Sequence, residues 1–469
     1  MKMLTCSRLS SYFSSSVRWL GKGVAVLWVI GDVSVQAQQL DQPQKQPESA
    51  QAPVKWVQVK DLPAEATGTG NSKEKSGVIS TALKWWRSTD RPGDLQIHGF
   101  VTQAYIVTSD NDVFGNSDKG GSFGLTEAGL NASVRPLPKL QISAQVLSRR
   151  AGEGNTGMPR LDFAFLDYRL YSHETNQFGI RVGRLKNPFG FYNDTRDVAF
   201  TRPGILLPQS IYFDRTRNLG LSGDSVQLYG ETAVAKLGTI STQFGVWLPI
   251  VSDKDTQLSI LGAIPRGQLN REVSYIGRGI FETNDKRLRL GISGIWLNTS
   301  YDPSSKSHDP TGPGAFQFTP IYFSAQYNTE RWTLTSEYAI RHLKYDDNFN
   351  SRVLNGLNVY GESYYFQGEY RFTPRLEGIV RYDVLYTDRS DRDGSHWASQ
   401  SSARQGLEHT RFAKDITVGL RWNVTPEFML RAEYHHVNGT GWLSRLDNPA
   451  PKDTEQHWDL YSILASYRF

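Results

Sequence analysis

Basic residues cluster around an irregular stretch of the chain that lies between two strand-like sequences, at about residues 187–222. Arginine presents a fixed fork of donors that matches phosphate or carboxylate, so such a cluster could bind an anion. Acidic residues in the same stretch could instead pair with the basic ones. The basic residues are Arg181, Arg184, Lys186, Arg196, Arg202, Arg215 and Arg217, and the acidic ones are Asp194, Asp197 and Asp214.

An irregular segment of about 35 residues inside a compact domain is usually a functional loop. We interpret this one as a loop folded into the mouth of a β-barrel, where its charges form a constriction. The alternative is a set of mutually paired charges that only supports the barrel wall. Pro188 would end strand pairing and Gly190 would permit the sharp turn. Phe189 would fix the loop to the wall, or would belong to a stacking track if the solute were a sugar.

Other chemistry is weakly represented in the sequence. The nine histidines are scattered and lack the helical spacing of metal ligands. The acidic turn at Asp110 and Asp112 lacks the later ligands of a calcium loop. No glycine-rich phosphate loop and no Gly-x-Ser-x-Gly elbow is present. We therefore predict no metal, no cofactor and no catalytic residue, and we do not expect an enzyme.

The N-terminal residues predict export. Four basic residues precede an apolar run at 24–30, and small residues follow at 35–37, which is typical of a secretory signal peptide over residues 1–37. A buried apolar helix is the alternative. Cleavage would remove the single cysteine, Cys6, so the mature chain would have no thiol. It would also remove most of the formal net charge of +5, so this charge does not indicate a nucleic-acid partner.

Residues 38–93 are rich first in Gln and Pro and then in Gly, Ser and Lys, which predicts a flexible periplasmic segment. One short helix is expected within it, at residues 78–86. Beyond the signal sequence no run of 18 or more apolar residues occurs, so no transmembrane helix is predicted.

From residue 95 onward, apolar and polar residues alternate with a period of two. Leu140, Ile142, Ala144 and Val146, for example, alternate with polar residues. About sixteen such segments follow one another, and their connections are alternately short and long. This layout predicts an all-β fold over residues 94–469, a transmembrane antiparallel β-barrel whose third outer loop is the irregular segment. A soluble β-sandwich or propeller is the alternative.

The two faces of the expected barrel differ in character. The last strand places Tyr461, Ile463, Tyr467 and the terminal Phe469 on one face, as expected for a lipid-facing strand that closes a barrel. The polar faces would line the lumen, where rings of arginine favour anions. The expected wall arginines are Arg169, Arg371, Arg381, Arg421 and Arg431. Several acidic residues share this face, which weakens the argument for strong anion selectivity.

The segment Gly183-Arg-Leu-Lys-Asn-Pro-Phe-Gly190 resembles a Gly-x-x-Lys-x-Pro-Phe-Gly stretch of bacterial outer-membrane porins, and of the phosphate-selective porin O/P-like group in particular. The resemblance covers residues 95–469 in layout. It implies a homotrimer in the bacterial outer membrane, each barrel narrowed by its third loop. It also implies contact with outer-membrane lipid and lipopolysaccharide, and insertion by the barrel-assembly machinery through the C-terminal strand. Members of the wider group carry phosphate, dicarboxylates or other small solutes.

The function predicted from the sequence is passive diffusion of small hydrophilic solutes, anionic or neutral, with a preference for phosphate or carboxylate anions. Two alternatives stay open. One is an outer-membrane barrel enzyme of the lipase or protease type, with a Ser/His or Asp/His group at the outer rim. The other is a structural or adhesin barrel whose lumen is plugged.

Overall fold

The computed structural model describes residues 95–173, 175–262, 265–305, 312–346 and 356–469. The predicted signal peptide and the predicted segment at 38–93, with its short helix, lie outside these residues. No helix among the described residues is long and apolar enough to cross a membrane.

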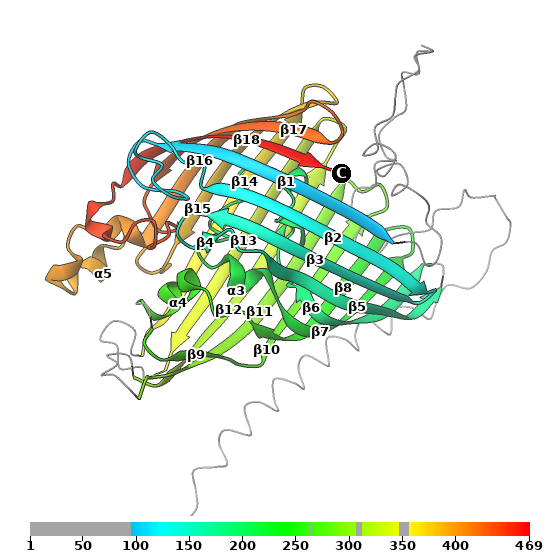
Figure 1. Cartoon of the computed structure of the whole chain (residues 1–469), viewed down its shortest axis with the longest axis horizontal. Coiled ribbons are helices and arrows are strands. Elements are labelled where there is room, and N and C mark those ends of the chain that lie inside the picture. The colour runs from blue at the N-terminus through cyan, green and yellow to red at the C-terminus, as the bar shows by residue number, and fades with distance from the viewer. Residues whose placement is uncertain (1–94, 174, 263–264, 306–311, 347–355) are drawn as a thin grey trace, which may run out of the picture. The chain divides into compact units, whose positions relative to one another are not determined.

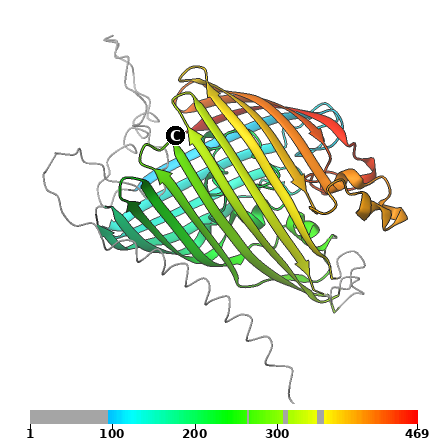
Figure 2. The ribbon, with the colours of Figure 1, turned by 180° about the vertical axis from the view of Figure 1, so that it is seen from behind.

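A single antiparallel sheet closes on itself to form a barrel, because β1 pairs with both β2 and β18 (Figures 1 and 2). Sixteen strands of 10–15 residues build its wall, which confirms the predicted fold and strand number. The first eight are β1 (Gln96–Thr108), β2 (Leu125–Leu137), β3 (Leu140–Ala151), β5 (Arg160–His173), β6 (Asn176–Lys186), β7 (Ser222–Val234), β8 (Gly238–Pro249) and β10 (Ser274–Thr283). The last eight are β11 (Leu288–Asp302), β12 (Gly314–Asn328), β13 (Trp332–Tyr345), β14 (Asn358–Arg371), β15 (Leu376–Tyr386), β16 (Phe412–Asn423), β17 (Phe428–Asn438) and β18 (His457–Arg468).

The remaining elements belong to the long connections. Two short strands, β4 (Asn155–Thr156) and β9 (Gln268–Arg271), pair with β3 and β11. The α-helices are α3 (Arg217–Leu221), α4 (Lys254–Leu261) and α5 (Ser395–Ser399). The 3₁₀ turns are η2 (Asn193–Thr195), η3 (Ala199–Thr201), η4 (Ser402–Arg404), η5 (Glu408–Arg411) and η6 (Pro451–Asp453).

The alternation read from the sequence explains the two faces of the wall. On β3, Ile142 and Val146 are exposed, whereas Ser143, Gln145 and Arg149 point inward and are buried. Exposed apolar side chains occur on every long strand, and they include Trp296, Trp332 and Trp422. A soluble protein rarely exposes a continuous apolar surface, so this outer face is built for contact with lipid.

The C-terminal residue completes the closure of the barrel. Phe469 exchanges two backbone hydrogen bonds with Gly99, at 3.0 and 3.1 Å. A Cβ on Gly99 would lie 2.4 Å from the ring of Phe469, so a larger residue there would have to displace this ring. The C-terminus lies at the end of the barrel that carries the short turns (Figure 1).

The long connections gather at the opposite end, where α5 protrudes (Figure 1). We call the two ends the long-loop end and the short-turn end. The long connections include loop 2 (152–159), loop 3 (187–221), loop 4 (250–273) and loop 8 (439–456). Loop 3 is the irregular segment of the sequence.

Candidate functional site

Loop 3 lies against the inner face of the barrel wall. Its backbone and side chains hydrogen-bond to inward-facing side chains of strands on opposite sides of the barrel. These wall residues are Glu127 on β2, Ser293 on β11, Glu337 on β13, Asp383 on β15 and Glu433 on β17. A segment that contacts all five strands must cross the interior. Figure 1 accordingly shows α3, the last part of loop 3, within the barrel outline.

The turn into loop 3 is formed by the Pro-Phe-Gly sequence. Phe189 is buried and its ring centre lies 5.1 Å from that of Tyr322 on β12. Gly190 adopts a positive φ of 55° and donates its N–H to Ser293 Oγ at 3.0 Å. A side chain there would meet the Tyr212 hydroxyl within 2.2 Å. These contacts involve Phe189 and Gly190, and the structural role of the Pro188-Phe189-Gly190 sequence stays a prediction.

Glu337 on β13 is the central acceptor for loop 3. Its carboxylate accepts hydrogen bonds from Phe191 N at 2.9 Å and from the Tyr212 hydroxyl at 2.6 Å, both in loop 3. It also accepts from the Tyr365 hydroxyl at 2.9 Å and from Ser324 Oγ at 2.5 Å, both on the wall. A fully buried carboxylate is costly unless it is hydrogen-bonded, and this one has four donors. This role of Glu337 was not predicted from the sequence.

A second wall group holds the middle of loop 3. Glu433 on β17 accepts from the backbone N–H of Ile205 at 2.6 Å and of Leu206 at 3.3 Å. Two predicted wall arginines donate hydrogen bonds to backbone carbonyls of the same stretch. Arg381 donates to Leu206 O at 3.1 Å, and Arg431 donates to Arg202 O. Both arginines are buried. They therefore position loop 3 and are not exposed to solute.

Most of the predicted constriction charges are paired with one another. Arg202 contacts Glu127 at 2.8 Å, Arg217 contacts Asp197, and Lys186 contacts both Asp197 and Asp162. Burial opposes ionisation of Asp197, but Lys186 and Arg217 outweigh it and hold the pKa of this carboxyl well below its usual range. These charges form a buried network that fastens loop 3 to β2, β5 and β6.

The other predicted constriction residues have separate partners. Arg181 on β6 contacts Asp167 at 2.8 Å, and Asp194 contacts Arg278 on β10. Arg196 donates to Tyr212 O at 3.1 Å. Burial, and to a smaller extent the positive charge of Arg217, lowers the pKa of Arg196 to about 9. Arg215 lies over the ring of Phe213, and burial lowers its pKa to about 10.

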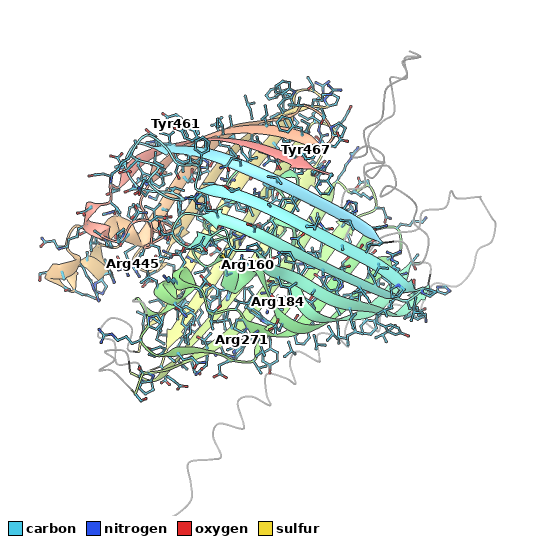
Figure 3. All side chains as sticks on the ribbon, in the orientation of Figure 1. Arg160, Arg184, Arg271, Arg445, Tyr461 and Tyr467 are labelled. Atoms are coloured by element: carbon cyan, nitrogen blue, oxygen red, sulfur yellow. The ribbon has the colours of Figure 1, made fainter. Side chains whose placement is uncertain are left out.

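Arg184 does not belong to the site, contrary to our prediction. It shares the outer face of β6 with the exposed Val182 and contacts Asp224 on β7 at 2.9 Å. Arg271 binds the other oxygen of Asp224 at 2.6 Å, so the two arginines share one carboxylate on the outside of the barrel (Figure 3). Strict alternation along β6 aims position 184 outward, and the alternation breaks only after it, at Lys186.

Three predicted wall arginines lie toward the short-turn end and are less covered. Arg169 and Arg421 are half-buried, and among the described residues neither has a carboxylate within 4.0 Å. Arg371 is exposed at the rim, 3.9 Å from Glu377. Arg289, another inward arginine, stacks over Phe191 of loop 3 with 4.5 Å between guanidinium and ring centre.

Apolar side chains cover loop 3 on its long-loop side, a feature that the sequence reading missed. Ile205 and Leu206 belong to a buried cluster that includes Trp442 and Leu443 of loop 8. Leu207 belongs to a second buried cluster, which includes Ile260 and Leu261 of α4 in loop 4. The short apolar runs of loops 3, 4 and 8 are far apart in the sequence. Nothing in their spacing predicts that the three loops meet inside the barrel.

A small cavity of about 30 Å³ lies where these loops meet, lined by Arg215 and Leu206 of loop 3, Asp255 of loop 4 and Trp442 and Asp447 of loop 8. Asp255 accepts from Ser444 Oγ at 2.7 Å, and Asp447 accepts from Glu153 N of loop 2 at 2.9 Å. Burial raises the pKa of Asp255 and of Asp447 to about 6, and neighbouring carboxylates add to both shifts. Within the described parts of the chain, no group of three or more His, Cys, Asp or Glu side chains could hold a metal ion.

Comparisons with known proteins add little to this geometry. No protein-family model and no curated protein sequence matches the chain. Similar solved structures include the outer membrane channel DcaP of Acinetobacter baumannii (11% identity, 81% of this chain and 99% of that chain, TM-score 0.48). They also include OprB of Pseudomonas putida (10%, 84% and 96%, 0.49) and OmpF of Salmonella typhi (13%, 80% and 98%, 0.49). At TM-scores below 0.5 these likenesses assign neither a family nor an activity, so the fold is taken from the strand pairing itself.

Proposed function

We propose that this protein is an outer-membrane channel for passive diffusion of small hydrophilic solutes, with loop 3 as its constriction. The observation that carries the proposal is a closed barrel with an apolar outer face and a charged inner face, crossed by a loop that is tied to the wall at five strands. In this proposal the long loops face the cell exterior and the short turns face the periplasm.

The proposed solute preference is for anions such as phosphate or carboxylates. The buried arginines of loop 3 are paired, so they do not support this preference. The support comes from accessible cations without a carboxylate within 4.0 Å among the described residues, namely Arg289 and Arg421, which lie in the short-turn half of the lumen. Unpaired guanidinium groups in a lumen raise the local concentration of anions. The resemblance to phosphate-selective porins is compatible with this but does not carry it.

The test is the reversal potential of single channels in a planar bilayer under a salt gradient. The wild-type protein should conduct with anion preference, and Arg289→Gln/Arg421→Gln should shift the reversal potential toward cations. Removal of the same type of charge from a periplasmic turn, in Arg331→Gln, should leave it unchanged. Cation preference in the wild-type protein would contradict the role of the arginines.

A plugged structural barrel is the second candidate, because the apolar clusters around Leu206 and Leu207 cover loop 3 from the long-loop side. A correctly folded barrel that never conducts would favour this candidate. Hydrolysis of lipid or peptide by the same preparation would instead favour the enzyme alternative. Homotrimer formation and insertion by the barrel-assembly machinery remain parts of the proposal, to be measured on the protein extracted from outer membranes.

A further inference from the structure

Lys186 is enclosed by buried polar side chains at the point where loop 3 begins. It is the last residue of β6, and its ammonium group contacts Asp162 on the neighbouring strand β5 and Asp197 in loop 3. Figure 1 shows β5 and β6 side by side, as their pairing requires. The exposed fraction is 12% for the Lys186 side chain, 1% for that of Asp162 and 3% for that of Asp197. Water therefore has little access to these three groups.

The Lys186 nitrogen lies symmetrically against the Asp162 carboxyl group. Nζ is 2.6 Å from Oδ2 and 2.7 Å from Oδ1, so it also lies close to Cγ, the carbon that joins the two oxygens. Reacting atoms that are held about 3 Å apart behave as if each were present at a very high concentration. A rotation of the carboxyl group about its own bond is enough to turn its carbonyl face toward the nitrogen. The pair is thus placed for a bond between Nζ and Cγ.

Two further side chains supply what such a reaction needs. Gln145 on β3 is 2% exposed and donates from Nε2 to Asp162 Oδ2 at 2.7 Å. An amide donor at this oxygen stabilises the negative charge that develops there when the carbon is attacked. Asp197 contacts Lys186 with one oxygen and Arg217 with the other, so it stays a carboxylate and can accept a proton. Asp162 has no second cation, because among the described residues only Lys186 lies within 4.0 Å of it.

We propose that Lys186 and Asp162 condense to form an isopeptide bond within the chain, with Asp197 as proton acceptor and Gln145 as donor to the carbonyl oxygen. A proton first passes from the Lys186 ammonium to Asp162, which gives an amine and a neutral carboxylic acid, the forms that burial favours. The lone pair of Nζ forms the new bond to Cγ, and Asp197 takes a proton from the nitrogen. This proton leaves with the hydroxyl group of Asp162 as water. One N–C bond forms and one C–O bond breaks, with no change in net charge or oxidation state.

Burial favours the product of this reaction over the ion pair. The ion pair keeps two charges away from water, whereas the amide is neutral, so the desolvation cost of both charges is removed. Exclusion of water also protects the bond from hydrolysis. Asp197 keeps Arg217 as its partner after the charge of Lys186 is lost. The bond joins β5 covalently to the start of loop 3, and it does not depend on which solute the channel carries.

The experiment is peptide mapping by mass spectrometry of the protein extracted from outer membranes, denatured and digested with trypsin. The wild-type digest should contain residues 161–169 joined to residues 185–196, with the loss of one water, because trypsin does not cleave after an amidated lysine. Fragmentation should place the link at Asp162. Separate peptides that end at an unmodified Lys186 would overturn the inference. A link between residues 185–196 and 197–202 would make Asp197 the acceptor of the bond, and would overturn the assignment of roles.

Variants separate the reaction from a simple ion pair. Lys186→Arg keeps the charge but lacks the amine, so it should lose the link completely while circular dichroism still reports the barrel. Asp197→Asn keeps the shape but not the proton acceptor, and should slow linkage after refolding by about 100-fold. The matched control is Lys139→Arg, an exposed lysine in the turn before β3, which should link as the wild-type protein does. Linkage of Asp197→Asn at the wild-type rate would contradict the role of Asp197.

Discussion

The two halves of the lumen are stabilised in different ways. In the long-loop half, loop 3 is covered by apolar residues of loops 4 and 8, and its charges are paired and buried. In the short-turn half, charged side chains such as Arg421 and Glu377 remain accessible, and the contact of Glu377 with Arg371 is long, at 3.9 Å. The comparison teaches that inward arginines differ in what covers them: the covered ones hold loop 3, and the accessible ones are the candidates for the proposed anion preference.

The largest change in unfolding free energy is expected from Glu337→Ala, which removes the acceptor of four hydrogen bonds. Four buried donors would then lack a partner, so we expect a loss of about 3 kcal/mol or more in unfolding free energy. Release of loop 3 should also raise the single-channel conductance. Urea unfolding and bilayer recordings measure the two effects.

The matched control is Glu330→Ala, an exposed acid in the turn before β13, which should change neither quantity measurably. Glu337→Gln should lie between the two, because the amide keeps the shape and part of the acceptor capacity. If Glu337→Ala unfolds and conducts as the wild-type protein does, loop 3 is not held by this residue.

The next largest effect is expected from Trp442→Ala/Leu443→Ala in loop 8. Truncation of large buried side chains costs about 3 kcal/mol each when the site does not collapse. Loop 8 should therefore separate from loop 3, become susceptible to protease, and leave a wider channel. Trp397→Ala, a truncation in the loop that carries α5, is the control and should not open loop 8. Unchanged proteolysis and conductance in the double variant would show that the apolar cover is not what closes the long-loop half.

The barrel was predictable from the sequence because its signal is repeated. In each strand, lipid-facing apolar residues alternate with inward polar residues. On β3, for example, Ile142 and Val146 face outward and Ser143 and Gln145 face inward. Sixteen such strands in succession predict a barrel more strongly than any single strand could. Even the outward direction of Arg184 follows from this period. Its assignment to the constriction failed because we gave its charge more weight than its place in the alternation.

The candidate site was predictable only in part. Composition identified loop 3 and its charges, but their partners depend on which wall residues the loop meets, and no local pattern encodes a contact between residues 205 and 433. The acceptors Glu337 and Glu433 resemble any other inward acid in the sequence. Their role appears only when their donors are known.

A smaller effect on the packing of loops 4 and 8 is expected from a change of pH, through the carboxyl groups of Asp255 and Asp447. Burial raises both pKa values to about 6, so the packed arrangement of loops 4 and 8 holds protons that the separated loops would release. The equilibrium between packed and separated loops should favour the packed form most below about pH 4. Its equilibrium constant should fall as the pH rises toward 6, by up to about tenfold per pH unit for each carboxyl. Proteolysis of loop 8 between pH 4.5 and 7.5 measures this, and Asp255→Asn should reduce the slope. Packing that tightens as pH rises would contradict the assignment.

The smallest effect is expected from Glu377→Gln in the short-turn half. Its contact with Arg371 is long, at 3.9 Å, and partly exposed, so the unfolding free energy should change by no more than about 0.5 kcal/mol. The reversal potential should nevertheless move toward anion preference, because one lumen acid is lost while Arg421 and Arg289 remain. The same substitution at the exposed Glu330 should alter neither quantity. A variant that changes selectivity without changing stability would separate the roles of the two halves, since a substitution in the buried network around Asp197 is expected to lower stability first.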